Sequence, residues 1–316
     1  MKIAIIGPGA LGCLLGALLF EAGEDVGLVD YRPDRVALLR RQGLRLDTAA
    51  GGTRTIPVPI GLPVDVAPAD LTIVAVKAHQ TRAAAQHLPR LLAAGGLALS
   101  LQNGLGNLEI MAQAAGPERL LAGVAFLGVT RKEEGEIILA GQGLILIGVP
   151  AGSQVSPEET ARVVAAFNRA GLECRERGDI EAALWEKLLV NVGINPLTAL
   201  LRVPNGALPE LPGAWDLALA AAAEALAVAR AAGINLAVDP EALLRQVCVS
   251  TAANRSSMLQ DVLAGRPTEI EALNGQASAR GRDLGVPTPV NDLLTQLLRA
   301  VTAVTSKQLA VDSHRY

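Results

Sequence analysis

The sequence predicts two kinds of structure in succession: an α/β N-terminal half built on a mostly parallel sheet, and an all-α C-terminal half. Short β-branched runs alternate with helical patterns up to about residue 176, which is typical of strand–helix–strand units. From Gly178 onward, long segments of 3.6-residue periodicity are separated by prolines and glycines. At 316 residues the chain exceeds what one core usually organises, so we expect two domains, residues 1–177 and 178–316.

The first expected strand covers residues 2–6, and further strands are expected at 26–30, 71–76, 97–101 and 121–129. Two later runs, 136–140 and 144–149, flank Gly141-Gln142-Gly143 and are expected to pair as a hairpin at the late edge of the sheet. A helix over 157–170 and a last strand over 172–177 complete this half. The second half is expected to contain helices only.

A glycine motif, Gly7-Pro8-Gly9-Ala10-Leu11-Gly12, lies between the first strand and the first helix. Gly7 makes the tight turn, Gly9 lets the backbone approach a pyrophosphate, and Gly12 lets the helix pack close to the strand. The N-terminus of the helix then faces the anion. In this context the motif favours a Rossmann-type dinucleotide-binding domain over a purely structural glycine turn.

Acidic and basic side chains lie together at the end of the second expected strand. Asp30 lies about eighteen residues after Gly12, where a carboxylate would hold the ribose 2′-hydroxyl of NAD. Arg32 follows at once and Arg35 is near, and an arginine here can bind the 2′-phosphate of NADPH. Alternatively, both arginines simply begin a solvated helix. These residues leave the choice between NADPH and NADH open.

A polar stripe follows one face of an otherwise apolar helix expected over residues 182–201. Lys187, Asn191 and Asn195 recur every four residues, which places them on one face, and Pro196 is expected to bend the helix beside Asn195. Burying a lysine among apolar side chains is costly and lowers its pKa toward the range useful for acid–base chemistry. The stripe is therefore a candidate active site. Alternatively, it joins an internal hydrogen-bond network or faces water.

Composition and charge exclude several functions. The net charge of −3, without a basic run interleaved with aromatic residues, argues against a nucleic-acid partner. The three histidines are scattered and the three cysteines are isolated, so we expect no metal site and no disulfide framework, and a reducing cytoplasm fits best. Residues 217–232 are apolar but short, and they carry Glu224 and Arg230; we therefore expect a packed helix and no membrane span.

A second polar cluster runs from Asn254 to Asp261 and continues with Thr268 and Glu269. On spacing alone, Ser256 and Thr268 are most simply interpreted as helix caps.

Taken together, these segments resemble the ketopantoate reductase family, the 2-dehydropantoate 2-reductases, over nearly the whole chain. The matching motifs are the glycine loop, Val76-Lys77-Ala78-His79-Gln80, Gln102-Asn103-Gly104, Glu186-Lys187-Leu188 with Asn191, Ile194-Asn195-Pro196-Leu197-Thr198-Ala199, Ser256-Ser257-Met258-Leu259-Gln260-Asp261 and Thr268-Glu269-Ile270.

The resemblance implies reduction of 2-dehydropantoate to (R)-pantoate with NADPH, on the route to pantothenate and coenzyme A. It implies that Lys187 is the general acid at the carbonyl oxygen and that Glu269 assists it, binding substrate and contacting the cofactor. The remaining implied roles concern binding. Asn191 and Asn195 would bind the hydroxyl and carbonyl groups of the substrate, and Ser257 would bind its carboxylate. Lys77 and Gln80 would contact the cofactor. Asn103 would contact both the substrate and the cofactor.

Other functions remain open beside this one. Asp30 departs from the basic pattern that the family uses after the second strand, so either Arg32 still captures the 2′-phosphate or the chain uses NADH. A related dehydrogenase acting on another small keto or hydroxy acid is the nearest alternative, and a dinucleotide-binding sensor without turnover is the alternative from another class. The Ala-rich helix around residues 215–232, together with the habit of the resembled family, favours a homodimer.

Overall fold

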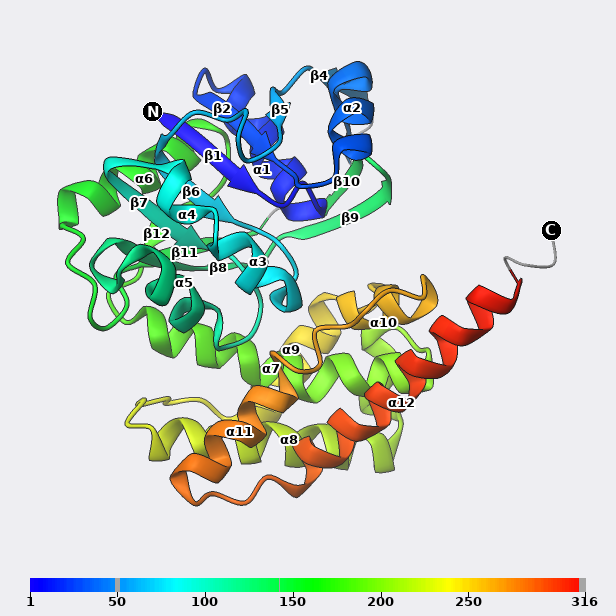
Figure 1. The fold of residues 1–316 in the computed structure, drawn as a ribbon. Helices are drawn as coiled ribbons and strands as arrows, with labels where there is room; N and C mark the ends of the chain where they lie inside the picture. Colours follow the sequence, from blue (N-terminus) through cyan, green and yellow to red (C-terminus); the bar gives the residue numbers. More distant parts are fainter. Residues whose placement is uncertain (49–51, 142, 313–316) are drawn as a thin grey trace. The chain divides into compact units, whose positions relative to one another are not determined.

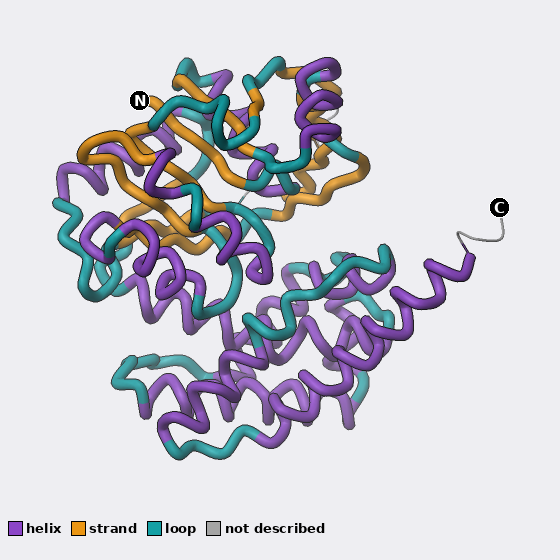
Figure 2. The backbone as a smooth tube through the Cα atoms, viewed as in Figure 1, coloured by secondary structure: helices purple, strands orange, loops and turns teal. Residues whose placement is uncertain are grey.

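The computed structural model describes residues 1–48, 52–141 and 143–312. It divides into two compact units (Figure 1). The first consists of Met1–Gln102 and Gly106–Ile180, and the second of Asn103–Leu105 together with the chain from Glu181 onward. The strands, orange in Figure 2, belong to the first unit, and the described part of the second unit is built from helices and loops.

An eight-stranded sheet forms the centre of the first unit, in the order β12-β11-β8-β7-β6-β1-β2-β5. Neighbouring strands are parallel except for β8 and β11, which pair antiparallel. The mostly parallel sheet expected from the sequence is therefore confirmed. Its strands are β1 (Lys2–Ile6), β2 (Asp25–Val29), β5 (Ile60–Gly61), β6 (Ala69–Val74), β7 (Leu92–Ser100), β8 (Leu120–Ala125), β11 (Ile145–Gly148) and β12 (Cys174–Glu176).

Helices cover both faces of this sheet, as is usual for parallel strands. Successive strand residues point to opposite sides, so each strand contributes to two apolar clusters. On β1, Ile3 and Ile5 join the apolar cluster that includes α1 (Ala10–Glu21) and α6 (Pro157–Arg169). Ala4 and Ile6 join the opposite cluster, against α3 (Thr81–Ala85), α4 (Leu88–Leu91) and α5 (Asn107–Ala115). Short 3-10 turns precede α3 (η1, Ala78–Gln80) and follow α5 (η2, Pro117–Arg119).

A second, four-stranded sheet packs on the outer side of α1. Its order is β4-β3-β10-β9, with α2 (Pro33–Gln42) leading into it. Leu46 of β3 and Ile137 of β10 lie in the same apolar cluster as the α1 residues Leu14 and Leu15, so α1 is buried on both sides. This explains why α1 is apolar almost all round. The strands are β3 (Leu44–Thr48), β4 (Thr53–Ile56), β9 (Gly128–Glu133) and β10 (Glu136–Gly141).

Two expectations about the later strands are wrong. The run 121–129 is not one strand but parts of β8 and β9, which lie in different sheets, and the runs 136–140 and 144–149 do not pair with each other. Instead β10 pairs antiparallel with β9, and β11 with β8. The hairpin turn lies at Glu134-Gly135, where Gly135 has φ +77°, a conformation that suits a tight hairpin turn. Gln142, in the expected turn, lies outside the described residues.

The second unit is a helical assembly with two apolar clusters that both include residues of α7 (Ile180–Leu201) and α8 (Pro212–Ala231). By length and composition alone α8 could cross a membrane, yet its alanine face, including Ala221 and Ala225, is buried in this core. The remaining elements are η3 (Asn205–Glu210), α9 (Pro240–Ser250), α10 (Ser257–Leu263), α11 (Asn274–Leu284) and α12 (Pro289–Asp312).

Candidate active site

The glycine loop joins β1 to α1, and two of its glycines are required by packing. A Cβ on Gly7, which has φ +97°, would lie 2.5 Å from Val76 Cγ1, and one on Gly12 would lie 2.1 Å from the Gly7 carbonyl oxygen. Gly9 differs, because a Cβ there would meet no atom within 4 Å. The chain is therefore close-packed behind the loop and open in front of Gly9.

The start of α1 faces this open side with a bare helix terminus. Gly9 is the N-cap, no side chain caps the helix, and its first turn contains no acidic residue. The first N–H groups of a helix have no partner within the helix and carry its positive dipole end. A phosphate-bearing ligand approaching Gly9 would meet these N–H groups, so the loop fits the pyrophosphate of a dinucleotide.

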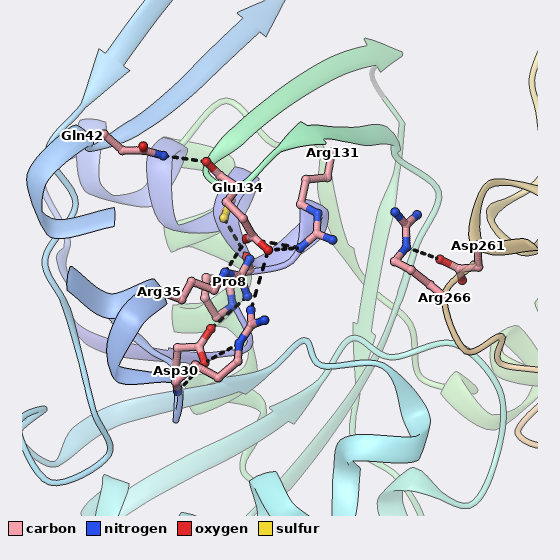
Figure 3. Close-up of polar contacts among 10 residues, drawn as sticks. Pro8, Asp30, Arg35, Gln42, Arg131, Glu134, Asp261 and Arg266 are labelled. Atoms are coloured by element: carbon pink, nitrogen blue, oxygen red, sulfur yellow. Dashed lines mark hydrogen bonds and ion pairs between the residues drawn. The ribbon is translucent and has the colours of Figure 1, made fainter. Parts of the chain in front are cut away.

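Asp30, at the end of β2, is already engaged within the protein (Figure 3). One carboxylate oxygen accepts from the Arg32 backbone N–H at 2.9 Å, and the other accepts from Arg35 Nη1 at 2.9 Å. Only 4% of Asp30 is exposed. Arg32, by contrast, has half of its side chain exposed, and its Nε lies 3.5 Å from the same carboxylate. The group offered to solvent at the end of β2 is thus the arginine, with the carboxylate behind it.

Arg35 connects three parts of the first unit (Figure 3). Besides Asp30, its guanidinium donates to the carbonyl oxygen of Pro8 in the glycine loop, and its Nε lies 2.5 Å from Glu134 on the β9–β10 turn. Glu134 also pairs with Arg131 at 3.3 Å. The alternative that Arg35 begins a solvated helix is wrong, since it is 8% exposed and shares the buried face of α2 with Leu39.

The Pro8 carbonyl has a second donor in Cys13, whose Sγ lies 3.1 Å away. Burial raises the pKa of the Cys13 thiol to about 12, so it stays protonated and able to donate at neutral pH. Two buried donors therefore hold this carbonyl oxygen, and with it the orientation of the loop.

The expected cofactor-side residues Lys77 and Gln80 lie on the loop after β6 and are partly buried. Lys77 is the N-cap of η1, and its carbonyl accepts from the Gln80 N–H at 2.8 Å. The buried amide of Gln102 donates to the Val76 carbonyl at 3.0 Å and to Thr81 Oγ1 at 2.6 Å. Gln102 thereby fixes the segment that closes against Gly7.

In the second unit, the polar stripe of α7 lies as the spacing predicts, with Lys187 and Asn191 partly buried and Asn195 8% exposed. Although Lys187 keeps some accessible surface, desolvation of its ammonium group lowers the pKa from 10.5 to about 8, and the charge of Glu269 opposes that shift. The Asn191 and Asn195 side-chain amides make no hydrogen bond to the described residues, which leaves them able to bind a ligand.

Glu269 and Asn103 meet beside this lysine. Glu269 is 7% exposed, and its Oε2 accepts from Asn103 Nδ2 at 3.3 Å. Asn103 begins the three-residue segment that belongs to the second unit, and Leu105 anchors this segment by donating to the Ala272 carbonyl at 3.0 Å. Gly104, with φ +80°, is required here, because a Cβ would lie 2.2 Å from the same carbonyl oxygen.

The two serines at the start of α10 have different surroundings. Ser256 is a helix cap, as its residue type suggests: its Oγ accepts from the Leu259 N–H at 3.1 Å and lies 2.8 Å from Thr198 Oγ1 on α7. Ser257 is exposed at the first position of α10, and its hydroxyl makes no hydrogen bond to the described residues. The substrate-binding role expected of Ser257 is thus open to it.

Sequence reasoning missed Glu134, and it missed the contacts by which Arg35 and Gln102 hold neighbouring loops. Arg35 carried a signal, because it lies four residues before Leu39 and therefore on the same helix face. Glu134 carried none for its pairing with Arg35, since that partner lies far away in the sequence. Gln102 belonged to a recognised motif, but only the structure shows which loop it holds.

Two family models match the chain, one in each half of the sequence. Residues 3–152 match the model described as Ketopantoate reductase PanE/ApbA, and residues 179–302 match Ketopantoate reductase PanE/ApbA C terminal. The chain is also 38% identical over 300 residues to a 2-dehydropantoate 2-reductase from Halobacterium salinarum, an alignment covering 95% of this chain and 98% of that one.

Two solved structures are similar over nearly their whole length. The ketopantoate reductase of Ralstonia eutropha JMP134 has a TM-score of 0.87 and 32% identity, covering 96% of this chain and 99% of that one. D-mandelate dehydrogenase, in a ternary structure with NADH and anilino(oxo)acetate, has a TM-score of 0.89 and 27% identity with the same coverage.

Proposed function

The chain belongs to the ketopantoate reductase family, and on that premise we propose that it reduces 2-dehydropantoate to (R)-pantoate, a step toward pantothenate and coenzyme A. The observation that carries the proposal is Lys187, a desolvated lysine with a pKa of about 8, set beside buried Glu269 and in line with two available amides. An α-keto acid needs this combination: an acid for its ketone oxygen and donors for its other oxygens.

Lys187 acts as the general acid. Its Nζ gives a proton to the ketone oxygen as the carbon is reduced, and lysine is left as a neutral amine, a form that the surrounding protein favours. Glu269 hydrogen-bonds the substrate while its charge keeps part of the lysine population protonated. Asn191 and Asn195 orient the substrate's hydroxyl and carbonyl groups, and Ser257 receives its carboxylate.

The first unit holds a nicotinamide dinucleotide, which supplies the hydride when bound. Gly9 and the start of α1 take the pyrophosphate, and Lys77, Gln80 and Asn103 contact the remainder of the cofactor, as does Glu269. Of the two cofactors we favour NADPH. The Asp30 carboxylate is buried and paired with Arg35, whereas Arg32 is exposed beside it and offers a cation to a 2′-phosphate.

A second candidate is the reduction of a different small 2-keto acid by the same two-domain architecture. The observation in its favour is the similarity to D-mandelate dehydrogenase, whose structure contains NADH. With this second candidate, NADH is the alternative cofactor of this chain.

The test is steady-state oxidation of NADPH and NADH in parallel, with 2-dehydropantoate as substrate and pyruvate and 2-oxoisovalerate as controls. We expect turnover confined to 2-dehydropantoate and a higher kcat/KM with NADPH. Turnover of a control acid instead would select the second candidate. Dinucleotide binding without turnover of any of the three acids would contradict the reduction of 2-dehydropantoate, and would leave either another 2-keto acid as the substrate or a sensor without turnover.

Compartment and assembly are further parts of the proposal. Three buried free thiols suit a reducing cytoplasm. Exposed Leu293, Leu297 and Val304 follow one side of α12 and would be covered in a homodimer. Light scattering of the purified chain, giving its mass in solution, tests the assembly.

A further inference from the structure

A proline lies inside α7, in the part of the helix that carries the proposed substrate amides. α7 runs from Ile180 to Leu201 with Pro196 in its interior. In an α-helix the carbonyl of residue i accepts from the N–H of residue i+4, and proline has no N–H. The carbonyl of Val192, a residue with no exposed surface, therefore lacks its helical donor.

Asn274, at the start of α11, supplies the missing donor. Its Nδ2 lies 3.0 Å from the Val192 carbonyl oxygen and 3.0 Å from Asn291 Oδ1. Both partners are acceptors, which requires the two hydrogens of an amide nitrogen. The Asn274 side chain is completely buried, and its own Oδ1 accepts no hydrogen bond from the described residues. A buried amide that leaves its oxygen unsatisfied is costly, so its value lies in what the nitrogen donates.

The position of Asn274 is fixed from a third helix. Asn291, also fully buried, donates through Nδ2 to Glu224 Oε2 at 2.7 Å and to the Ala221 carbonyl at 3.0 Å, both on α8. The Glu224 carboxylate also accepts from the backbone N–H groups of Val290 and Asn291 at 2.9 and 3.0 Å. These contacts set the Asn291 amide so that its oxygen faces Asn274.

We propose that Asn274 is a positioning residue, which replaces the hydrogen bond that Pro196 removes from α7 and thereby fixes Asn191 and Asn195 relative to Lys187. Val192 follows Asn191 directly, and Pro196 follows Asn195 directly. A helix left with an unpaired carbonyl at this point would be free to change its direction between the two amides. The proposal deepens the proposed function, on which its kinetic test rests.

The test is a double-mutant cycle that restores the helical donor. Pro196→Ala returns an N–H at position 196, so Val192 regains a partner within α7. We expect Asn274→Leu, which keeps the approximate shape but has no donor, to lower kcat/KM for the keto acid by about 10- to 100-fold. In the Pro196→Ala background the same substitution should cost less than about threefold. An equal factor in both backgrounds overturns the proposal.

Further controls separate positioning from folding. Assays are run well below the Tm of each variant, and NADPH affinity should be unchanged in all of them. Ser278→Ala, one turn along α11 and equally buried, is the matched control and should leave kcat/KM unchanged. If Asn274→Leu folds only together with Pro196→Ala, the compensation is supported, whereas failure to fold in both backgrounds contradicts it.

Amide hydrogen exchange across residues 192–201 repeats the cycle without any substrate. Faster exchange in Asn274→Leu that Pro196→Ala reverses supports the proposal even if 2-dehydropantoate is not turned over. Unchanged exchange in Asn274→Leu overturns it, whatever the assay of activity shows.

Discussion

Lys187 illustrates how one residue's surroundings prepare it for proton transfer. Desolvation makes the ammonium form costly and lowers the pKa to about 8, while Glu269 opposes the shift. A lysine with an ordinary pKa would hold its proton too tightly to be an efficient acid near neutral pH, because general acids work best when their pKa lies near the working pH. The two opposing effects together place Lys187 in that range.

The pH dependence of reduction follows from this pKa. Reduction consumes the proton on Nζ, so the active form is present below the pKa and is lost as the pH rises through it. We expect kcat/KM to be level below about pH 8 and to fall about tenfold per unit above it. Glu269→Gln should move the fall to lower pH, because the carboxylate raises the lysine pKa. A profile level beyond 10.5, the ordinary lysine value, would assign the proton to another group.

At this scale the sequence predicted what depends on spacing and missed what depends on distant partners. The four-residue interval of Lys187, Asn191 and Asn195 places them on one face in any helix, so the stripe was predictable. The burial of Arg35 depends on Glu134, which a later turn brings to it. No pattern around either residue contains that pairing.

Among the elements, α1 has the closest link between sequence and proposed task. It is buried between two sheets and needs Gly12 for packing, whereas Gly9 at its start faces open space. The same motif therefore contains one glycine whose role is structural and one whose role is to leave room.

Substitution of these two glycines by alanine should separate the roles. Gly9→Ala adds a methyl group in open space at φ −76°, so Tm should fall by no more than about 2–4 °C, the effect of roughly 1 kcal/mol at a helix cap. NADPH affinity, measured by fluorescence titration, should weaken by about tenfold or more, because the methyl group meets the pyrophosphate. Gly12→Ala should lower Tm much further, since its Cβ would collide with backbone.

Gly213→Ala is the matched control, since this glycine also has open space around it and lies in the first turn of α8, in the second unit. It should change neither cofactor affinity nor turnover. Unchanged affinity in Gly9→Ala would remove Gly9 from the cofactor site.

The sequence predicted individual elements better than their pairing. β1, α6 and α7 follow strong local patterns, and the structure contains them close to their expected ends. The partners of β10 and β11 were predicted wrongly, because adjacency along the chain favoured a hairpin between them. Sheet pairing depends on which apolar face each strand covers, and β10 covers α1 while β11 extends the main sheet.

For the whole molecule, the candidate residues separate into two groups, with the glycine loop in the first unit and the lysine stripe in the second. Lys187→Met should therefore reduce turnover by about 10²- to 10⁴-fold, the usual contribution of a general acid, while the Kd for NADPH stays as in the unmodified chain. Isothermal titration and steady-state assays on one preparation provide both values. Near-normal turnover would exclude Lys187 as the acid, and parallel loss of both properties would indicate misfolding.

The segment Asn103–Leu105 has a consequence for recombination between relatives. A chimera joined near residue 180 would take its C-terminal helices from one parent but these three residues from the other. Ala272 and Glu269, their contacts, would then face a foreign tripeptide, which must still provide the amide of Asn103 and the bare backbone of Gly104. Exchange of the helical half between family members therefore requires two grafts, the second of them only three residues long.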